Sequence, residues 1–158
     1  MMTLAIFPGS FDPITLGHLD VIERASKVFS EVRVLLVHNS KKQTLFSLDK
    51  RIELIKESVR HIQGVTVDSY EGLTVQYVVE QNGHAMIRGL RGAKDFEYEM
   101  QVAAVNRKFA PNVETFFLAT SGELAFISST IVKEAAKYKQ PLKELVPQAV
   151  ENALRLSY

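Results

Sequence analysis

The chain has 158 residues, of which 46% are hydrophobic and 23% are charged, and its formal net charge is +1. These values predict one globular domain over residues 1–158 with its own core, and they argue against nucleic acid as a partner. The absence of cysteine excludes disulfides and thiolate metal sites. We find no leader pattern and no apolar run near the ~20 residues that span a bilayer, so we expect a cytoplasmic protein without membrane contact.

Short apolar runs alternate with helical patterns along the whole chain. The sequence predicts strands at 3–7, 32–38, 65–70, 85–88 and 114–119. It predicts helices at 17–29, 48–61, 73–82, 93–109, 129–139 and about 142–156. This alternation with short connections predicts an α/β fold: a doubly wound, five-stranded parallel sheet with helices on both faces.

The helix predicted at 93–109 has the clearest pattern. Its residues Tyr98, Val102, Val105 and Phe109 recur at helical spacing, which predicts one buried stripe. We expect the helices from about residue 129 onward to pack on the sheet. In such sheets ligands bind beyond the carboxyl ends of the strands, where the strand order reverses. Residues that follow the strands are therefore the candidates for chemistry.

The first strand is followed by a glycine-rich loop and then by Gly17-His18. Glycines let a backbone come close to a ligand, and a helix start favours anions. The same helix dipole disfavours a charged ring, so we expect a neutral His18 that donates a hydrogen bond to phosphate. We interpret His18 as this donor and not as a helix cap. The alternative is a partly exposed surface histidine in a turn.

Basic residues follow the second and fourth strands. Lys41 and Lys42 are either solvated or bind phosphate as point charges. Arg88 and Arg91 are each followed by a glycine and are suited to bidentate phosphate binding, or they form surface salt bridges. Two acids lie four residues apart on the next helix, where they orient the arginines, hold a ribose or form a solvated face. These acids are Asp95 and Glu99.

The fifth strand leads to three consecutive hydroxyl residues at a helix start, Ser128, Ser129 and Thr130. Capping explains one of them. Three hydroxyls together with free backbone amides also form an anion cradle, and both interpretations stay open at this point. The lysine-containing P-loop and the three-glycine dinucleotide fingerprint are absent from the sequence, so a nucleotide site here is of another kind.

These motifs together resemble a known family. Thr15 with Gly17-His18 is similar to the first signature of the nucleotidylyltransferase superfamily, and 127–130 resembles its second signature. Segments 8–15, 87–91 and 95–100 look like those of the bacterial phosphopantetheine adenylyltransferase family. The resemblance covers nearly the whole chain, and it implies a Rossmann-like fold.

The resemblance implies that ATP and 4′-phosphopantetheine react, with Mg²⁺, to give dephospho-coenzyme A and pyrophosphate. The implied chemistry is in-line attack on the α-phosphorus without a covalent enzyme intermediate. A homohexamer and feedback inhibition by coenzyme A are also implied. Two alternatives remain: a sister nucleotidylyltransferase that uses nicotinamide mononucleotide or glycerol 3-phosphate, and a non-catalytic nucleotide-binding module.

Site residues are implied by the same resemblance. The acceptor would contact Ser10, Lys42, Thr74 and Arg88, with Lys41 as the alternative to Lys42. The catalytic residues would be His18, Lys42, Arg91 and Ser129. The residues that bind ATP would be Ser10, Phe11, His18, Gly89, Leu90, Arg91, Glu99, Leu124, Ala125, Phe126, Ile127, Ser128, Ser129 and Thr130.

Overall fold

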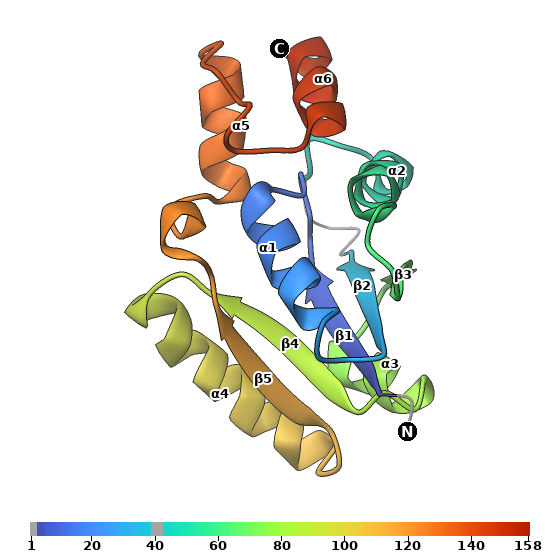
Figure 1. Ribbon diagram of the computed structural model, residues 1–158. Helices are drawn as coiled ribbons and strands as arrows, with labels where there is room; N and C mark the ends of the chain where they lie inside the picture. The colour runs from blue at the N-terminus through green and yellow to red at the C-terminus, as the bar shows by residue number, and fades with distance from the viewer. Residues whose placement is uncertain (1–2, 39–42) are drawn as a thin grey trace.

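The sheet confirms the predicted fold class in a computed structural model that describes residues 3–38 and 43–158 (Figure 1). Its five strands are β1 (Leu4–Gly9), β2 (Glu31–Val37), β3 (Val65–Tyr70), β4 (Ala85–Leu90) and β5 (Glu114–Ala119). All pairs are parallel, and the strand order is β3-β2-β1-β4-β5. The order reverses between β1 and β4, so this is where a ligand is expected.

Six α-helices and one 3₁₀ turn connect and follow the strands in the described part of the chain. They are α1 (Leu16–Ala25), α2 (Leu48–Val59), α3 (Thr74–Glu80), α4 (Ala93–Phe109), η1 (Gly122–Leu124), α5 (Ser129–Lys137) and α6 (Gln148–Ser157). None of the helices within 3–38 and 43–158 is long and apolar enough to cross a membrane.

Two helix ends differ from the prediction by four residues or more. α1 ends at Ala25, four residues early, because the Ser26 hydroxyl donates to the Glu23 carbonyl and the next amides form tighter turns. α6 begins after Pro147 and not at 142. A proline ring lacks an amide hydrogen and restricts the residue before it, so the segment before Pro147 forms turns instead.

The core lies on both faces of the sheet. In β1, Ala5 and Phe7 join a buried cluster that includes residues of α1, α2, α5 and α6. Ile6 points to the opposite face and packs with Val78 of α3. This alternation follows from the period of two residues in a strand. The layers hold the carboxyl ends of β1 and β4 in a fixed position beside the starts of α1 and α5 (Figure 1).

The predicted buried stripe on α4 is wrong for a single chain. Tyr98 and Phe109 are each 64% exposed and Val105 is 51% exposed, whereas Glu99 is the buried residue of this helix. α4 lies along β4 and β5 at one edge of the molecule (Figure 1). Periodicity indicates that a helix has an apolar face, but it does not indicate which element covers that face.

Candidate active site

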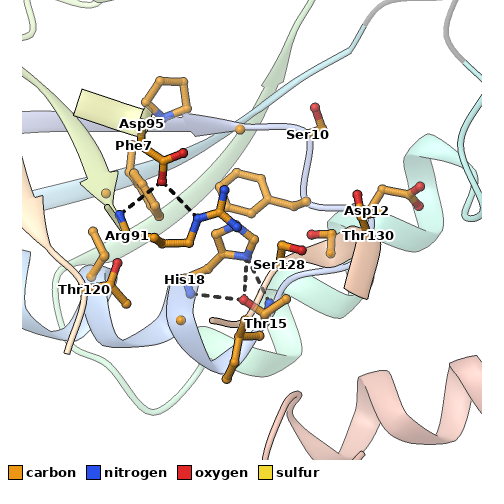
Figure 2. A pocket seen from close by; sticks show the side chains of 18 of the residues that line it. Phe7, Ser10, Asp12, Thr15, His18, Arg91, Asp95, Thr120, Ser128 and Thr130 are labelled. Carbon is orange, nitrogen blue, oxygen red and sulfur yellow. Dashed lines mark hydrogen bonds and ion pairs between the residues drawn. The ribbon is translucent and has the colours of Figure 1, made fainter. Parts of the chain in front are cut away.

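A cleft of about 550 Å³ opens at the carboxyl ends of β1 and β4 (Figure 2). It receives residues from the loop after β1, from α1, from the β4–α4 segment and from the start of α5. The sequence-predicted residues that line it are Ser10, Phe11, His18, Arg88, Gly89, Arg91, Glu99, Ile127, Ser128, Ser129 and Thr130. Residues distant in the sequence therefore meet where the strand order predicts a ligand.

The remaining predicted residues lie elsewhere. Thr74 lines a separate, smaller cavity behind Arg88. The described residues that line the cleft do not include Leu90, Leu124, Ala125 or Phe126. Lys42, and Lys41 as its alternative, lie outside the described residues.

The loop after β1 places an aromatic ring against His18. Phe11 adopts a left-handed backbone conformation with φ of 45°, and its ring packs edge-on against the His18 imidazole, with 5.0 Å between ring centroids. A Cβ atom at Gly9 would lie 3.0 Å from the Phe11 ring. A side chain at position 9 would therefore crowd the Phe11 ring and push it against or away from the imidazole.

His18 is part of a helix cap, contrary to the interpretation from sequence. Thr15 is the N-cap of α1: its hydroxyl accepts from the His18 amide, and the Thr15 amide donates to His18 Nδ1 at 3.0 Å. An amide nitrogen is only a donor, so Nδ1 must be unprotonated and the proton of the neutral ring is on Nε2. The cap therefore selects the tautomer that can donate a hydrogen bond through Nε2.

The charge state of His18 follows from its surroundings. Burial, together with the nearby positive charge of Arg91, lowers the pKa of His18 from 6.5 to about 4. The ring is therefore neutral at physiological pH, as the sequence predicts. Figure 2 shows the ring near the centre of the cleft, with the Arg91–Asp95 pair beside it.

The start of α1 has few free amides. The Leu16 amide donates to the Leu145 carbonyl at 2.9 Å, and the His18 amide donates to Thr15. Both amides are thus used within the protein, although the sequence interpretation assigned this helix start to an anion. Among the side chains of α1, the His18 ring offers a hydrogen-bond donor to the cleft.

Each cleft arginine is held by an acid of α4. Arg88 forms a bidentate pair with Glu99, with nitrogen–oxygen distances of 2.7 and 2.6 Å, and Nη1 of Arg88 also donates to the Pro8 carbonyl at 3.2 Å. Nε of Arg91 and the Arg91 amide both donate to Asp95 at 3.1 Å. Of the roles left open for the two acids, the structure shows that of orienting the arginines.

Sequence reasoning missed the ion pair formed by Asp12 and Lys133, both of which line the cleft. Asp12 is buried and accepts from the Leu45 and Phe46 amides and from Lys133 Nζ at 3.0 Å. Burial alone would raise the pKa of Asp12, but these donors lower it overall. Lys133 follows Ser129 by four residues, and this helical spacing is a signal that could have identified it.

The three hydroxyls at the start of α5 have separate positions. Ser128 is the N-cap, and its hydroxyl accepts from the Ile131 amide at 3.2 Å. The Ser129 hydroxyl donates to the Pro13 carbonyl at 2.8 Å, which fastens α5 to the loop after β1. Thr130 is exposed and lines the cleft. Capping thus accounts for Ser128 and not for the other two.

A second cavity of about 140 Å³ lies on the other side of Arg88. Pro8, Arg88 and Glu99 line both cavities. The second cavity is otherwise lined by Leu73, Thr74, Met86, Tyr98, Val102, Ala103, Asn106 and Thr115. The Arg88–Glu99 pair therefore lies at the boundary between the polar cleft and a smaller, mostly apolar space.

Residues 6–135 match the model of the cytidylyltransferase-like family. The chain belongs to this family. It is therefore a nucleotidyltransferase by family membership, and the cleft is its candidate active site. A solved structure with a similar fold is that of a Vibrio parahaemolyticus protein assigned as a nicotinate-nucleotide adenylyltransferase. The two sequences are 18% identical. The structural match covers 98% of this chain and 99% of the Vibrio chain, with a TM-score of 0.73.

Proposed function

We propose that this nucleotidyltransferase transfers the adenylyl group of ATP to 4′-phosphopantetheine, giving dephospho-coenzyme A and pyrophosphate. The observation that carries the proposal is the position of Arg88, whose guanidinium lies between two cavities of different chemistry. A phosphate held there would place a phosphate oxygen toward the cleft and the rest of the acceptor in the second cavity. The sequence resemblance to the phosphopantetheine adenylyltransferase family supports the same assignment.

The second cavity suits the pantetheine arm. Leu73, Met86 and Val102 offer apolar contact to its methylene groups, while Thr74 and Asn106 offer polar groups to its amides. Small-molecule sites combine a mostly apolar lining with a few polar groups in this way. Thr74 thus retains the acceptor-binding role that the sequence predicts.

The cleft suits the triphosphate. His18 presents Nε2–H, and Arg91 presents a guanidinium that Asp95 holds in place. We propose that both stabilise charge that develops on the phosphates as pyrophosphate leaves. The attacking phosphate is already anionic near pH 7, so the reaction needs positioning and charge stabilisation but no protein base. Ser129 and Thr130 complete the proposed phosphate contacts.

We propose that Mg²⁺ enters with ATP, bound to the substrate phosphates. Within residues 3–38 and 43–158, no three acidic or histidine side chains are grouped to hold a metal. The carboxylates of the cleft are each bonded to a cation, Asp12 to Lys133, Asp95 to Arg91 and Glu99 to Arg88. Mg²⁺ commonly relies on substrate phosphates for much of its coordination.

A second candidate acceptor is nicotinate mononucleotide, because the similar solved structure is assigned to that activity. The deciding experiment measures pyrophosphate release from ATP or CTP with 4′-phosphopantetheine, nicotinate mononucleotide, nicotinamide mononucleotide or glycerol 3-phosphate. We expect release only with ATP and 4′-phosphopantetheine. Release with another acceptor would replace the proposed substrate. No release with any pair would favour a non-catalytic nucleotide-binding module.

The role of Arg88 can be tested by comparing two ligands. Arg88→Ala should weaken the binding of 4′-phosphopantetheine, measured by calorimetry, more than the binding of dephosphorylated pantetheine. The reason is that only 4′-phosphopantetheine has a phosphate that can contact the guanidinium. Equal losses for the two ligands would show that Arg88 only supports the local structure.

We also propose that residues 1–158 act as one nucleotidylyltransferase domain and that copies of it assemble into a homohexamer. A single buried cluster extends from Ala5 of β1 to Leu154 of α6. The exposed apolar side chains of α4, among them Tyr98 and Phe109, form a face of the kind that marks subunit interfaces. Light scattering after size exclusion tests the assembly, and a monomer at micromolar concentration would refute it. Inhibition by coenzyme A, which shares the acceptor's pantetheine arm, remains a prediction.

A further inference from the structure

One arginine near the cleft has no role in the proposed mechanism. Arg51 lies in the first turns of α2 and is only 5% exposed, which makes it the one buried arginine of the described chain. Its Nη1 donates to the Ser10 carbonyl at 2.8 Å. Ser10 itself is exposed and lines the cleft, so the guanidinium lies directly behind the loop that faces the ligand.

Arg51 also differs from the other arginines because it forms no ion pair with a carboxylate of the described residues. The other seven arginines of the chain each pair with a carboxylate. Within residues 3–38 and 43–158 no carboxylate lies within pairing distance of Arg51, and its Nε has no hydrogen-bond partner. The sequence of 39–42, Asn-Ser-Lys-Lys, contains no acid. Within the described residues, the buried guanidinium therefore has no ion-pair partner.

The charged side chains that line the cleft are, in contrast to Arg51, all paired. Among its described lining residues, three cations face three carboxylates, and they form the pairs Arg88–Glu99, Arg91–Asp95 and Lys133–Asp12. With His18 neutral, these side chains contribute no net charge. Arg51, which has no ion-pair partner among the described residues, therefore adds one positive charge to this balanced set.

A buried, unpaired cation destabilises a folded protein. If Arg51 served only to hold the Ser10 carbonyl, a neutral donor would do so without this cost. The physical advantage of a cation arises when an anion occupies the cleft, because a guanidinium shielded from water attracts an anion more strongly than an exposed one does.

We propose that Arg51 is a positioning residue for the phosphates of the nucleotide. It holds the Ser10 carbonyl and thereby the loop after β1, and its charge favours a phosphate anion on the other side of that loop. The proposal rests on the proposed function to the extent that the cleft binds nucleotide phosphates, whichever acceptor is used.

The test separates the charge from the hydrogen bond. Arg51→Gln keeps an amide donor without the charge, and Arg51→Lys keeps the charge. Arg60→Gln is the matched control, since it removes one charge from an exposed arginine at the end of the same helix. Calorimetry measures the Kd of pyrophosphate and of ATP with Mg²⁺, and thermal melts measure the ligand-free Tm.

We expect Arg51→Gln to weaken pyrophosphate binding at least about tenfold, the effect of losing a charge in a poorly solvated site. Arg51→Lys should stay within about threefold of the wild type, and Arg60→Gln should bind normally because exposed charges are screened. The ligand-free Tm of Arg51→Gln should be equal to or above that of the wild type, because an uncompensated buried charge is removed.

Two results would overturn the proposal alone: unchanged pyrophosphate binding by Arg51→Gln, or a ligand-free Arg51→Gln protein that melts well below the wild type or does not fold. The second would make Arg51 a structural residue. A wild-type chain that binds neither pyrophosphate nor ATP would overturn both this proposal and the proposed function. Wild-type binding without transfer to 4′-phosphopantetheine would overturn the proposed acceptor and leave the role of Arg51 supported.

Discussion

The starts of α1 and α5 border the same cleft but use their side chains differently. At α1 one side chain has two roles: Nδ1 of His18 completes the cap with Thr15, and this bond leaves the proton on Nε2. At α5 the roles are divided: Ser128 caps the helix, Ser129 bonds to Pro13, and Thr130 lies at the cleft. A histidine has two distinct nitrogens, so it can cap with one and donate with the other.

This difference predicts how substitutions at the two helix starts affect the stability of the protein and its turnover. A change at α1 should alter both, because one ring provides both. At α5, the effect should depend on which hydroxyl is removed, because each hydroxyl has its own partner: loss of the Ser128 cap should reduce stability alone, whereas loss of the Ser129 hydroxyl should reduce stability and turnover.

His18→Ala should lower kcat by roughly 10²–10³, the range for removing one donor that stabilises a transition state. ATP binding should weaken much less. Steady-state kinetics of pyrophosphate release provide the measurement, and His61→Ala, which removes an exposed histidine, provides the control. Turnover close to that of the wild type would show that Nε2 of His18 does not act on the reacting phosphates.

The α1 start should also show a pH dependence that the α5 start lacks. The pKa of His18 is about 4 when folded and 6.5 when unfolded, so well above pH 6.5 its titration has little effect on the free energy of unfolding. As the pH falls below 6.5, the unfolded chain takes up a proton that the folded chain does not. The free energy of unfolding should therefore decrease, by on the order of 2 kcal/mol at about pH 5.

Urea unfolding at pH 7 and pH 5 measures this effect. His18→Gln, which does not titrate, should lose less stability between the two pH values than the wild type does, and Ser128→Ala should lose as much as the wild type. The same loss in His18→Gln and the wild type would contradict a neutral His18 in the folded state.

Ser129→Ala should lower turnover about tenfold, equivalent to about 1.4 kcal/mol of barrier. The hydroxyl fastens α5 to the loop that leads to Ser10 and His18, so its loss should displace Thr130 and that loop relative to each other. The lost hydrogen bond should also reduce stability by about 1 kcal/mol. Kinetics and thermal melts of the same preparation test both parts, and full activity of the variant would remove Ser129 from the proposed machinery.

Ser128→Ala should reduce stability by about 1 kcal/mol, the usual effect of losing an N-cap, and should leave kcat nearly unchanged. Ser128→Asp, which restores a capping acceptor, should recover the stability. Thermal melts and pyrophosphate release distinguish the outcomes. A large loss of turnover in Ser128→Ala that Ser128→Asp does not restore would mean that the cap hydroxyl also contacts substrate.

The sequence by itself determined the features that depend on neighbours along the chain. The strands and helices follow from periodicity, and the parallel, doubly wound class of the sheet follows from strand–helix alternation. The glycine-rich loop with Gly17-His18 and the hydroxyl triplet at 128–130 were also identifiable. These interactions span at most a few residues, so local patterns contain them.

Only the tertiary structure decided which partner each functional group has. Asp12 and Lys133 are 121 residues apart in sequence, and Arg51 reaches Ser10 over 41 residues. Such pairs depend on how the layers pack, and no periodicity encodes them. The exposure of the apolar side chains of α4 also depends on how the layers pack. The sequence pattern shows that the helix has an apolar face, but it does not show which element packs against that face. The fold therefore follows from short-range patterns, whereas the charge balance of the cleft follows from long-range packing.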